Sequence, residues 1–341
     1  MQAFVKYGKN PLETGLREVP VPEPAVEEVL IAVAGCGICG SDLHAYRASP
    51  GYEWVIPPVI LGHEFAGTVA AVGAGVNGYQ PGDKVVVIAI QGCDHCQFCR
   101  SGDTNLCSDR RVIGLNMNGG MAPYAVVNPR YLIRLPENFE LSAAAAIETF
   151  SVAIHALSKT SIYPEQRIVV TGPGPVGLFS ALVARLNGAR VLICGTEVDA
   201  ALRLPAAEQL GLRTTNTDQV PLPRAVTHVF GNQPPDLWIE ASGATAALKA
   251  SMDLVRRGGS IVVLAMYHRE FSWFPTIPVR AEQTLLFSYA SVYRDYIYAI
   301  RLMEAHAADV QRLMQFFPLQ RASEAFEEAN AGRTLKAILV P

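Results

Sequence analysis

A turn containing three glycines constrains the fold of this chain more than any other feature. It reads Gly172-Pro173-Gly174-Pro175-Val176-Gly177 and joins a buried-strand candidate, 167–171, to an apolar-periodic stretch, 178–186. Glycines at this spacing permit a tight turn, close approach of the backbone to a pyrophosphate and close packing of the next helix, whose N-terminus favours an anion. The strand–turn–helix context therefore predicts a dinucleotide-binding turn rather than a purely structural glycine turn.

Strand-like and helix-length segments alternate after this turn. The strand candidates are 191–194, 236–240 and 259–264, with helical patterns between them. Such alternation predicts a parallel, doubly wound sheet with helices on both faces. Before residue 150, short strand-like runs broken by Gly and Pro indicate a β-rich domain with functional loops. We therefore expect an α/β chain of two domains, with a Rossmann domain over 151–289.

Composition and charge narrow the class of partner. The 341 residues carry a formal net charge of −3, and their basic residues are scattered. Nucleic acid and anionic membranes are therefore poor candidate partners, and we expect a small molecule instead. The longest apolar runs, 85–90 and 141–147, fall far short of the roughly 20 residues that cross a bilayer. The N-terminal residues lack the pattern of a secretory signal, so we expect a cytoplasmic protein.

Four cysteines form a dense cluster. They follow the spacing Cys-x2-Cys-x2-Cys-x7-Cys at Cys93, Cys96, Cys99 and Cys107. Thiolates spaced in this way can converge on one tetrahedral metal, and four sulfurs leave no open position for water or substrate. The clustering of the chain's seven cysteines suits a reducing compartment better than a disulfide framework. We expect a structural zinc site, with four unconnected buried cysteines or an iron–sulfur cluster as alternatives.

A second group mixes several kinds of metal ligand. The stretch 35–44 reads Gly-Cys-Gly-Ile-Cys-Gly-Ser-Asp-Leu-His, and Gly62-His63-Glu64 follows it. A thiolate, an imidazole and a carboxylate within loops are typical of an open catalytic zinc site, which keeps one position for water or a substrate oxygen. The histidine of a lone Gly-His-Glu is more often a hydrogen-bonded loop residue than a metal ligand. By itself, this group therefore only suggests a zinc site.

The order of these motifs resembles the zinc-containing medium-chain alcohol dehydrogenases over essentially the full length of the chain. Within that family it resembles the sorbitol, threonine and butanediol dehydrogenase branch. The resemblance implies a GroES-like catalytic zinc-binding domain over 1–150, completed by about 290–341, beside the Rossmann domain. It also implies one catalytic zinc ion, one structural zinc ion and a homo-oligomer, either a dimer or a homotetramer.

The resemblance also assigns the zinc ligands. The family's ligand cysteine lies in Cys-Gly-Ser-Asp, which implies Cys39 and leaves Cys36 as a packed neighbour. His63 is then the second ligand, and Glu64 binds zinc or lies just behind it. Glu148 matches a glutamate of the polyol branch that either contacts zinc or holds its water. A helix-surface charge is the alternative for Glu148, although its apolar surroundings disfavour it because an unpaired buried carboxylate is costly.

Ser41 and His44 match the positions of the family's proton relay. Zinc lowers the pKa of a bound alcohol, and the Ser41 hydroxyl can pass the released proton toward His44 and solvent. A plain turn residue is the alternative for Ser41.

The choice of cofactor rests on the end of the second Rossmann strand. An acidic residue that holds the ribose hydroxyls is expected there, but the chain has Gly195. A small residue leaves room for a 2′-phosphate, which Arg203 could approach, whereas Glu197 would repel a phosphate and could bind the ribose instead. We expect NAD, with NADP as the alternative. The expected cofactor-binding residues are Gly172, Gly174, Pro175, Val176, Gly177, Gly195, Thr196, Glu197, Arg203, Val263, Leu264, Ala265, Ser288 and Tyr289. Of these, Val263–Ala265 and Ser288–Tyr289 follow from the resemblance, and core packing explains them equally well.

These features lead to an expected reaction. A secondary alcohol of a polyol, sugar alcohol or diol is oxidised reversibly to a ketone, with hydride transfer to NAD(P). The glutamate at position 148 favours a polyhydroxylated substrate or a small diol. L-threonine 3-dehydrogenase is the first alternative. A zinc-independent quinone reductase of the same fold and a non-catalytic sensor of cofactor redox state are further alternatives.

Overall fold

The computed structural model describes all 341 residues and divides them into two compact units. The first unit comprises 1–149, 291–331 and 336–341, and the second comprises 150–290 and 332–335. The chain therefore returns to the first unit after residue 290, apart from one short segment. No helix is both long enough and apolar enough to cross a membrane.

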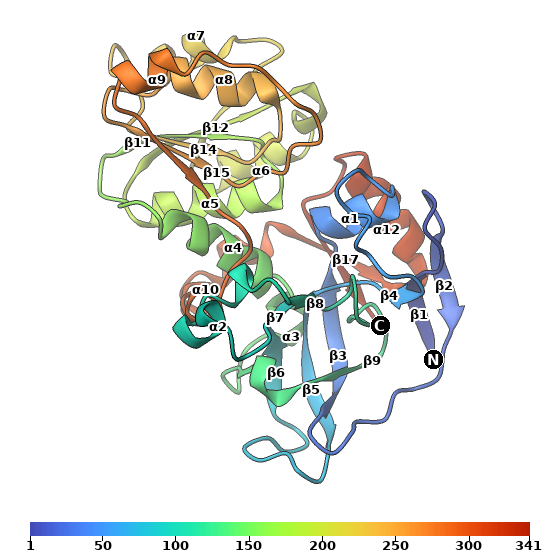
Figure 1. Cartoon of the computed structure of the whole chain (residues 1–341). Coiled ribbons are helices and arrows are strands. Elements are labelled where there is room, and N and C mark those ends of the chain that lie inside the picture. The colour runs from blue at the N-terminus through green and yellow to red at the C-terminus, as the bar shows by residue number, and fades with distance from the viewer. The chain divides into compact units, whose positions relative to one another are not determined.

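The first unit is built mainly from antiparallel strands (Figure 1). Its largest sheet has the order β10-β6-β5-β3-β18-β17, with β9 also paired to β3. The strands of this sheet are β3 (Val29–Gly37), β5 (Glu64–Val72), β6 (Lys84–Val87), β9 (Tyr124–Val127), β10 (Leu132–Arg134), β17 (Met314–Pro318) and β18 (Lys336–Val340). Two smaller sheets contain β1 (Gln2–Lys6), β2 (Thr14–Glu18) and β4 (Val59–Ile60), and β7 (Ile90–Gln91) and β8 (Arg111–Val112).

Short helices join or cover these strands. They are α1 (Gly40–Tyr46), α2 (Gln97–Ser101), α3 (Leu141–Ala144), α10 (Tyr293–Ala305), α11 (Ala307–Gln311) and α12 (Ala322–Asn330). Single 3-10 turns cover Thr104–Leu106, Pro129–Tyr131 and Leu319–Arg321 in this unit and Glu197–Asp199 in the second.

The second unit is the predicted parallel, doubly wound sheet. Its strand order is β13-β12-β11-β14-β15-β16, and every pairing is parallel. The strands are β11 (Arg167–Thr171), β12 (Arg190–Gly195), β13 (Arg213–Asn216), β14 (Leu237–Glu240), β15 (Ser260–Val263) and β16 (Thr284–Phe287). The helices are α4 (Ile147–Leu157), which begins in the first unit, α5 (Pro175–Leu186), α6 (Arg203–Gln209), α7 (Leu222–Phe230), α8 (Thr245–Leu254) and α9 (Thr276–Arg280).

The core of the second unit lies on both faces of the central strands. Figure 1 shows α8 and α9 on one face of the sheet and α5 on the other. Because both faces are covered, β11 reads as a continuous apolar run in which Ile168, Val169 and Val170 are all fully buried. The buried Trp238 indole donates to the Thr171 hydroxyl at 3.0 Å. The strand order reverses between β11 and β14, and ligands of such sheets bind outside the carboxyl ends at that point.

Candidate functional site

Two neighbouring strands deliver the first candidate metal group. Gly37 at the end of β3 is paired with Glu64 at the start of β5. Cys39 follows β3 and caps α1, while His63 precedes β5. One potential ligand atom from each of Cys39, His63 and Glu64 lies within 4.8 Å of the others. These three residues, which lie far apart in the sequence, are thus brought together, whereas Cys36 is a buried thiol outside the group.

Asp42 connects two members of this group, although no sequence pattern assigned it a role. Its carboxylate is fully buried; Oδ2 accepts the backbone N–H of Cys39 at 2.9 Å, and Oδ1 lies 3.6 Å from Nδ1 of His63. With Nδ1 facing a carboxylate, the other ring nitrogen is left for a metal ion, and this arrangement fixes the orientation of a ligating histidine. The Cys-x-x-Asp spacing, which is that of a helix-capping box, was the available sequence signal.

Glu64 is paired with a buried lysine from the last strand. Lys336 forms an ion pair with the Glu64 carboxylate, and its ammonium group donates to the carbonyl of Ile38 at 2.8 Å. Both side chains are fully buried, so each charge depends on the other. A Cβ at Gly37 would lie 2.9 Å from Cε of Lys336 and closer still to the Glu64 carboxylate, which explains the glycine. Lys336 was not identified from sequence because nothing local marks a lysine in a terminal strand as buried.

Glu148 lies outside the three-residue group. Its side chain is buried near the start of α4, so it is not a helix-surface charge. Burial, followed by the nearby charge of Glu64, raises the pKa of Glu148 to about 7. Glu148 is therefore a carboxyl group that can take up or release a proton near neutral pH.

The first metal group fits a zinc ion by its donor set and its burial. A thiolate, an imidazole and a carboxylate are zinc ligands, and three protein ligands leave a position open. Oε1 of Glu64 is buried without a hydrogen-bond partner. Such an atom is costly to bury unless a ligand satisfies it, and a metal ion at this position would do so.

The predicted relay residues both lie on α1. Oγ of Ser41 is 3.5 Å from Sγ of Cys39, which places the hydroxyl beside the metal group. Nδ1 of His44 lies 3.2 Å from Oγ of Ser49, and its ring stacks on Tyr52 with 4.9 Å between centroids. Ser41 and His44 are each half-buried, so a proton at either residue is close to solvent.

The four clustered cysteines converge around α2. One sulfur from each of Cys93, Cys96, Cys99 and Cys107 lies within 4.8 Å of the others, and none forms a disulfide. The backbone N–H of Cys99 donates to Sγ of Cys96 at 3.5 Å. The backbone N–H of Cys93 donates to Sγ of Cys107 at 3.4 Å. Backbone hydrogen bonds lower the pKa of Cys93 to about 6, which favours its thiolate. The cluster therefore fits one tetrahedral zinc ion, and the alternative of four unconnected cysteines is wrong.

The glycine turn of the second unit leaves space at its tip. Gly172 has φ +90°, and a Cβ there would lie 2.6 Å from Cα of Ser242. A Cβ at Gly174, which caps α5, would meet nothing within 4 Å. A Cβ at Gly177 would collide with the carbonyl of Gly172, so only glycine allows α5 to pack this closely. Pro175 and Val176 form the first turn of α5, whose N-terminus is open to an anion.

A carboxylate to which no sequence pattern assigned a role, that of Asp199, lies just after the end of β12. A Cβ at Gly195 would lie 2.9 Å from Oδ2 of Asp199 and 2.9 Å from Cγ of Pro173, so the expected aspartate has no room. Oδ2 of Asp199 accepts the backbone N–H of Thr196 at 3.0 Å. The Arg203 guanidinium is held by Oδ1 of Asp199 at 3.2 Å and by the carbonyl of Thr334 at 3.0 Å. Arg203 is therefore already engaged within the second unit.

The remaining predicted cofactor residues lie at the same edge of the sheet. Glu197 follows β12, and its carboxylate accepts from the side chains of Asn216 and Gln219. Val263 ends β15 and Leu264 and Ala265 follow it, whereas Ser288 and Tyr289 follow β16. The Ser288 N–H donates to the carbonyl of Val263 at 2.9 Å. Parallel strands share one carboxyl edge, so all these positions lie on the side of the glycine turn.

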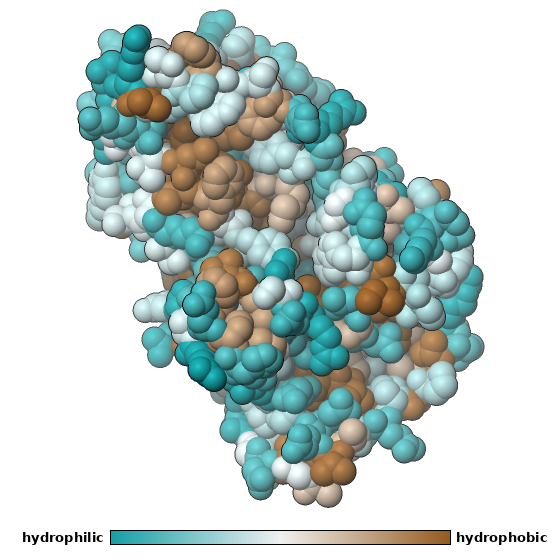
Figure 2. Space-filling view, viewed as in Figure 1, coloured by the Kyte–Doolittle hydropathy of each residue, from teal (hydrophilic) through white to brown (hydrophobic).

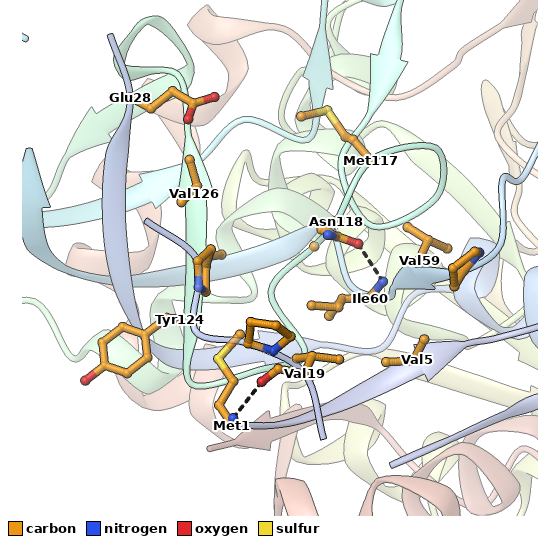
Figure 3. Close-up of a pocket in the computed structure, with 15 residues that line it drawn as sticks. Met1, Val5, Val19, Glu28, Val59, Ile60, Met117, Asn118, Tyr124 and Val126 are labelled. Atoms are coloured by element: carbon orange, nitrogen blue, oxygen red, sulfur yellow. Dashed lines mark hydrogen bonds between the residues drawn. The ribbon is translucent and has the colours of Figure 1, made fainter. Parts of the chain in front are cut away.

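A separate pocket of the first unit contains none of these residues. Figure 3 shows Val5, Val19, Ile60 and Tyr124 among its lining residues, with the Ile60 N–H donating to the Asn118 side chain at 3.0 Å. Its lining is mainly apolar and brings together no set of metal ligands or acid–base groups. We therefore place the candidate chemistry at Cys39, His63 and Glu64.

Comparisons with known proteins agree with this arrangement. Residues 25–137 match the model "Alcohol dehydrogenase GroES-like domain", and residues 175–305 match "Zinc-binding dehydrogenase". A sorbitol dehydrogenase of Halalkalibacterium halodurans is 32% identical over 100% of this chain and 99% of its own length. An L-threonine 3-dehydrogenase of Saccharopolyspora erythraea is 32% identical over 99% of this chain and 98% of its own.

Among solved structures, a zinc-binding dehydrogenase of Sinorhizobium meliloti bound to NADP superposes with a TM-score of 0.90. It is 26% identical and covers 100% of this chain and 99% of its own. The expected family and fold class are thereby confirmed, as are the expected zinc and nicotinamide dinucleotide, NAD or NADP. The chain belongs to the zinc-dependent medium-chain alcohol dehydrogenase family and is a dehydrogenase that works with zinc and a nicotinamide dinucleotide.

Proposed function

We propose that this protein reversibly oxidises a secondary alcohol of a polyol, sugar alcohol or small diol to the ketone. The convergence of Cys39, His63 and Glu64 within 4.8 Å carries the proposal. A zinc ion held there supplies Lewis-acid activation of the alcohol, and the nicotinamide accepts the hydride. Similarity to a protein named sorbitol dehydrogenase supports a polyhydroxylated substrate.

Each residue of the group has a distinct role in this proposal. Cys39 and His63 hold the metal ion, and Asp42 keeps the His63 ring oriented toward it. Glu64 is the third ligand, with Lys336 balancing its charge. Because Glu148 lies outside the group, we assign it to holding the water or the substrate hydroxyl rather than the ion. Cys93, Cys96, Cys99 and Cys107 hold a separate structural zinc ion.

The proton leaves through α1. Ser41, beside Cys39, accepts the proton that the alcohol loses and passes it to His44. His44 lies against Ser49 and Tyr52 and is half-buried, so it can release the proton to solvent.

NAD is the preferred cofactor in this proposal. The carboxylates of Glu197 and Asp199 follow the end of β12, where they favour ribose hydroxyls and repel a 2′-phosphate. Arg203, which would attract that phosphate, is held by Asp199 and Thr334. NADP is the alternative, since the related Sinorhizobium structure is bound to NADP.

Threonine is the second candidate substrate, because a relative that covers the full chain is named an L-threonine 3-dehydrogenase. The three-residue metal group disfavours a zinc-independent quinone reductase and a non-catalytic sensor, neither of which needs such ligands. A panel of polyols, sugars, diols and L-threonine, assayed with NAD and NADP separately, tests the proposal. We expect turnover of a polyol or diol with NAD, and turnover only of threonine would contradict the substrate class.

An apolar surface on the second unit supports a homo-oligomer, either a dimer or a homotetramer. β16 is an edge strand, and large apolar side chains are exposed beside it, including Phe274, Val279 and Phe287 at 68%, 71% and 69%. Figure 2 shows apolar side chains gathered on the second unit near α9. Exposed edge strands and large apolar patches are typical of interfaces, and a second copy offers the same edge for pairing.

The free cysteines support a cytoplasmic location, which we propose for this protein. All seven cysteines are free, and thiolate metal sites need to stay reduced. Fractionation of cells that express the tagged protein tests this location.

A further inference from the structure

The buried carboxylate of Glu240 has no part in the chemistry proposed above. Glu240 ends β14 and is fully buried. It accepts the backbone N–H groups of Ser242 at 2.9 Å and Gly243 at 3.4 Å, and the hydroxyls of Ser242 and Tyr267 as well. Every donor is a backbone or hydroxyl group, so Glu240 gathers neutral donors from two loops instead of pairing with a cation.

The first of these loops supports the glycine turn. Ser242 lies so close to Gly172 that a Cβ on the glycine would be 2.6 Å from Cα of Ser242 and 2.7 Å from its nitrogen. A shift of Ser242 would therefore move the backbone that a pyrophosphate must approach. Glu240 holds Ser242 through both its backbone N–H and its hydroxyl.

The second loop, 264–275, connects β15 to α9. Tyr267 donates its hydroxyl to Oε2 of Glu240, and its ring lies beside Phe271 with 6.0 Å between centroids. The backbone N–H groups of Leu264 and Ala265 donate to the Glu240 carbonyl at 2.9 and 3.3 Å. The same residue therefore anchors the start of this loop by its backbone and the middle of it by its side chain.

The first loop follows β14, which flanks the point where the strand order reverses, and the second follows the neighbouring strand β15. Dinucleotides bind outside the carboxyl ends of the strands at that point. We propose that Glu240 is a positioning residue for the dinucleotide. Before the cofactor binds, Glu240 fixes the Ser242 backbone against the glycine turn and holds the Tyr267 loop in place. The proposal rests on dinucleotide binding and is independent of the alcohol oxidised.

The expected effect is on affinity. A site that is already ordered binds at its intrinsic affinity, whereas a site that is ordered for only a fraction of the time has its dissociation constant raised by the inverse of that fraction. Tyr267→Phe removes one donor and keeps the ring against Phe271. Glu240→Gln keeps the shape but turns one acceptor into a donor that faces other donors.

The test measures the dissociation constant of NADH by fluorescence titration of the zinc-loaded protein without alcohol. We expect Tyr267→Phe to raise it roughly tenfold, as for loss of a hydrogen bond to a charged group. Hydrogen exchange of the amides in 264–270 should also become faster. Tyr163→Phe, in the loop before the amino end of β11, is the matched control and should bind NADH as the unmodified protein does.

Glu240→Gln should weaken NADH binding at least as much, and adding Tyr267→Phe to it should have little further effect because the two residues act together. Unchanged NADH affinity in a folded Tyr267→Phe protein would overturn the proposal, as would full additivity of the two changes. Failure of the unmodified protein to bind NADH or NADPH would instead remove the cofactor assignment itself, which keeps the two results distinguishable.

Discussion

Single residues behind the ligands determine whether the candidate metal group can hold its ion. Asp42 uses one oxygen for the Cys39 backbone and approaches His63 with the other. One buried carboxylate thus fixes the position of a thiolate and the orientation of an imidazole. Its effect is exerted through the ligands and not on the substrate.

Asp42→Asn should weaken zinc binding at the Cys39 group by about 10- to 100-fold, because an amide can donate to Nδ1 and favour the wrong tautomer. Competition with a chromophoric chelator measures this affinity. Zinc at the four-cysteine cluster serves as the internal control. Unchanged affinity at both sites would contradict the role of Asp42.

Asp236 contributes to the stability of the fold against acid. Burial alone would raise the pKa of Asp236, but hydrogen bonds from Arg167 and Arg256 outweigh it and hold the pKa at about 2. The folded pKa lies below the unfolded value near 4, so the carboxylate contributes stability above about pH 4 and loses it as pH falls toward 2. Its contribution is about 2 kcal/mol.

Asp236→Asn should therefore lower the free energy of unfolding at pH 7 and flatten its dependence on pH between about 4 and 2. Urea unfolding at several pH values measures both quantities. A pH dependence as steep as that of the unmodified protein would show that Asp236 is not the responsible group.

At the scale of elements, the sequence predicted features that depend on local patterns but not those that depend on pairing between distant segments. The strand–turn–helix motif at Gly172 and the alternation after it predicted the parallel sheet because each signal lies within one short window. Lys336 reaches Glu64 only because β18 pairs with β3, and no local signal records that pairing. The contact between Glu240 at the end of β14 and Tyr267 in the loop after β15 has no local signal either. The sequence thus indicated the residues of the candidate metal group but not the residues that support them.

We expect the loop around α2 to depend on the proposed zinc ion, because the four cysteines converge there and few other side chains within 92–110 are buried. Cys96→Ser should lower the zinc content from two ions per chain to one and speed hydrogen exchange within 90–112. Elemental analysis and exchange mass spectrometry measure these changes. A protein that lost the second ion without any change in exchange would contradict the stapling role.

The end of β12 offers a test of the cofactor loop. Gly195→Asp places a side chain where Asp199 and Pro173 already lie, so it should raise the KM for NAD instead of improving ribose binding. Initial rates at varied NAD, compared with those of Gly15→Asp on β2 of the first unit, where a Cβ would make only ordinary contacts, measure the effect. A lower KM for NAD would show that the loop accommodates the new carboxylate.

For the whole molecule, the proposed pairing of copies depends on the exposed apolar edge of the second unit. Val279→Glu should weaken the oligomer, because a charge would be buried in an apolar interface. Sedimentation velocity over a range of concentrations measures this, with Val26→Glu on the exposed surface of the first unit as the control. An oligomer unaffected by Val279→Glu would place the interface elsewhere.

The central claim is that Cys39 holds a zinc ion that the reaction needs. The most direct measurement compares zinc content and polyol oxidation in Cys39→Ser and Cys36→Ser proteins of equal thermal stability. We predict one zinc ion per chain and no turnover for Cys39→Ser, and two zinc ions with turnover retained for Cys36→Ser. Full activity of Cys39→Ser after its second ion is lost would contradict this account.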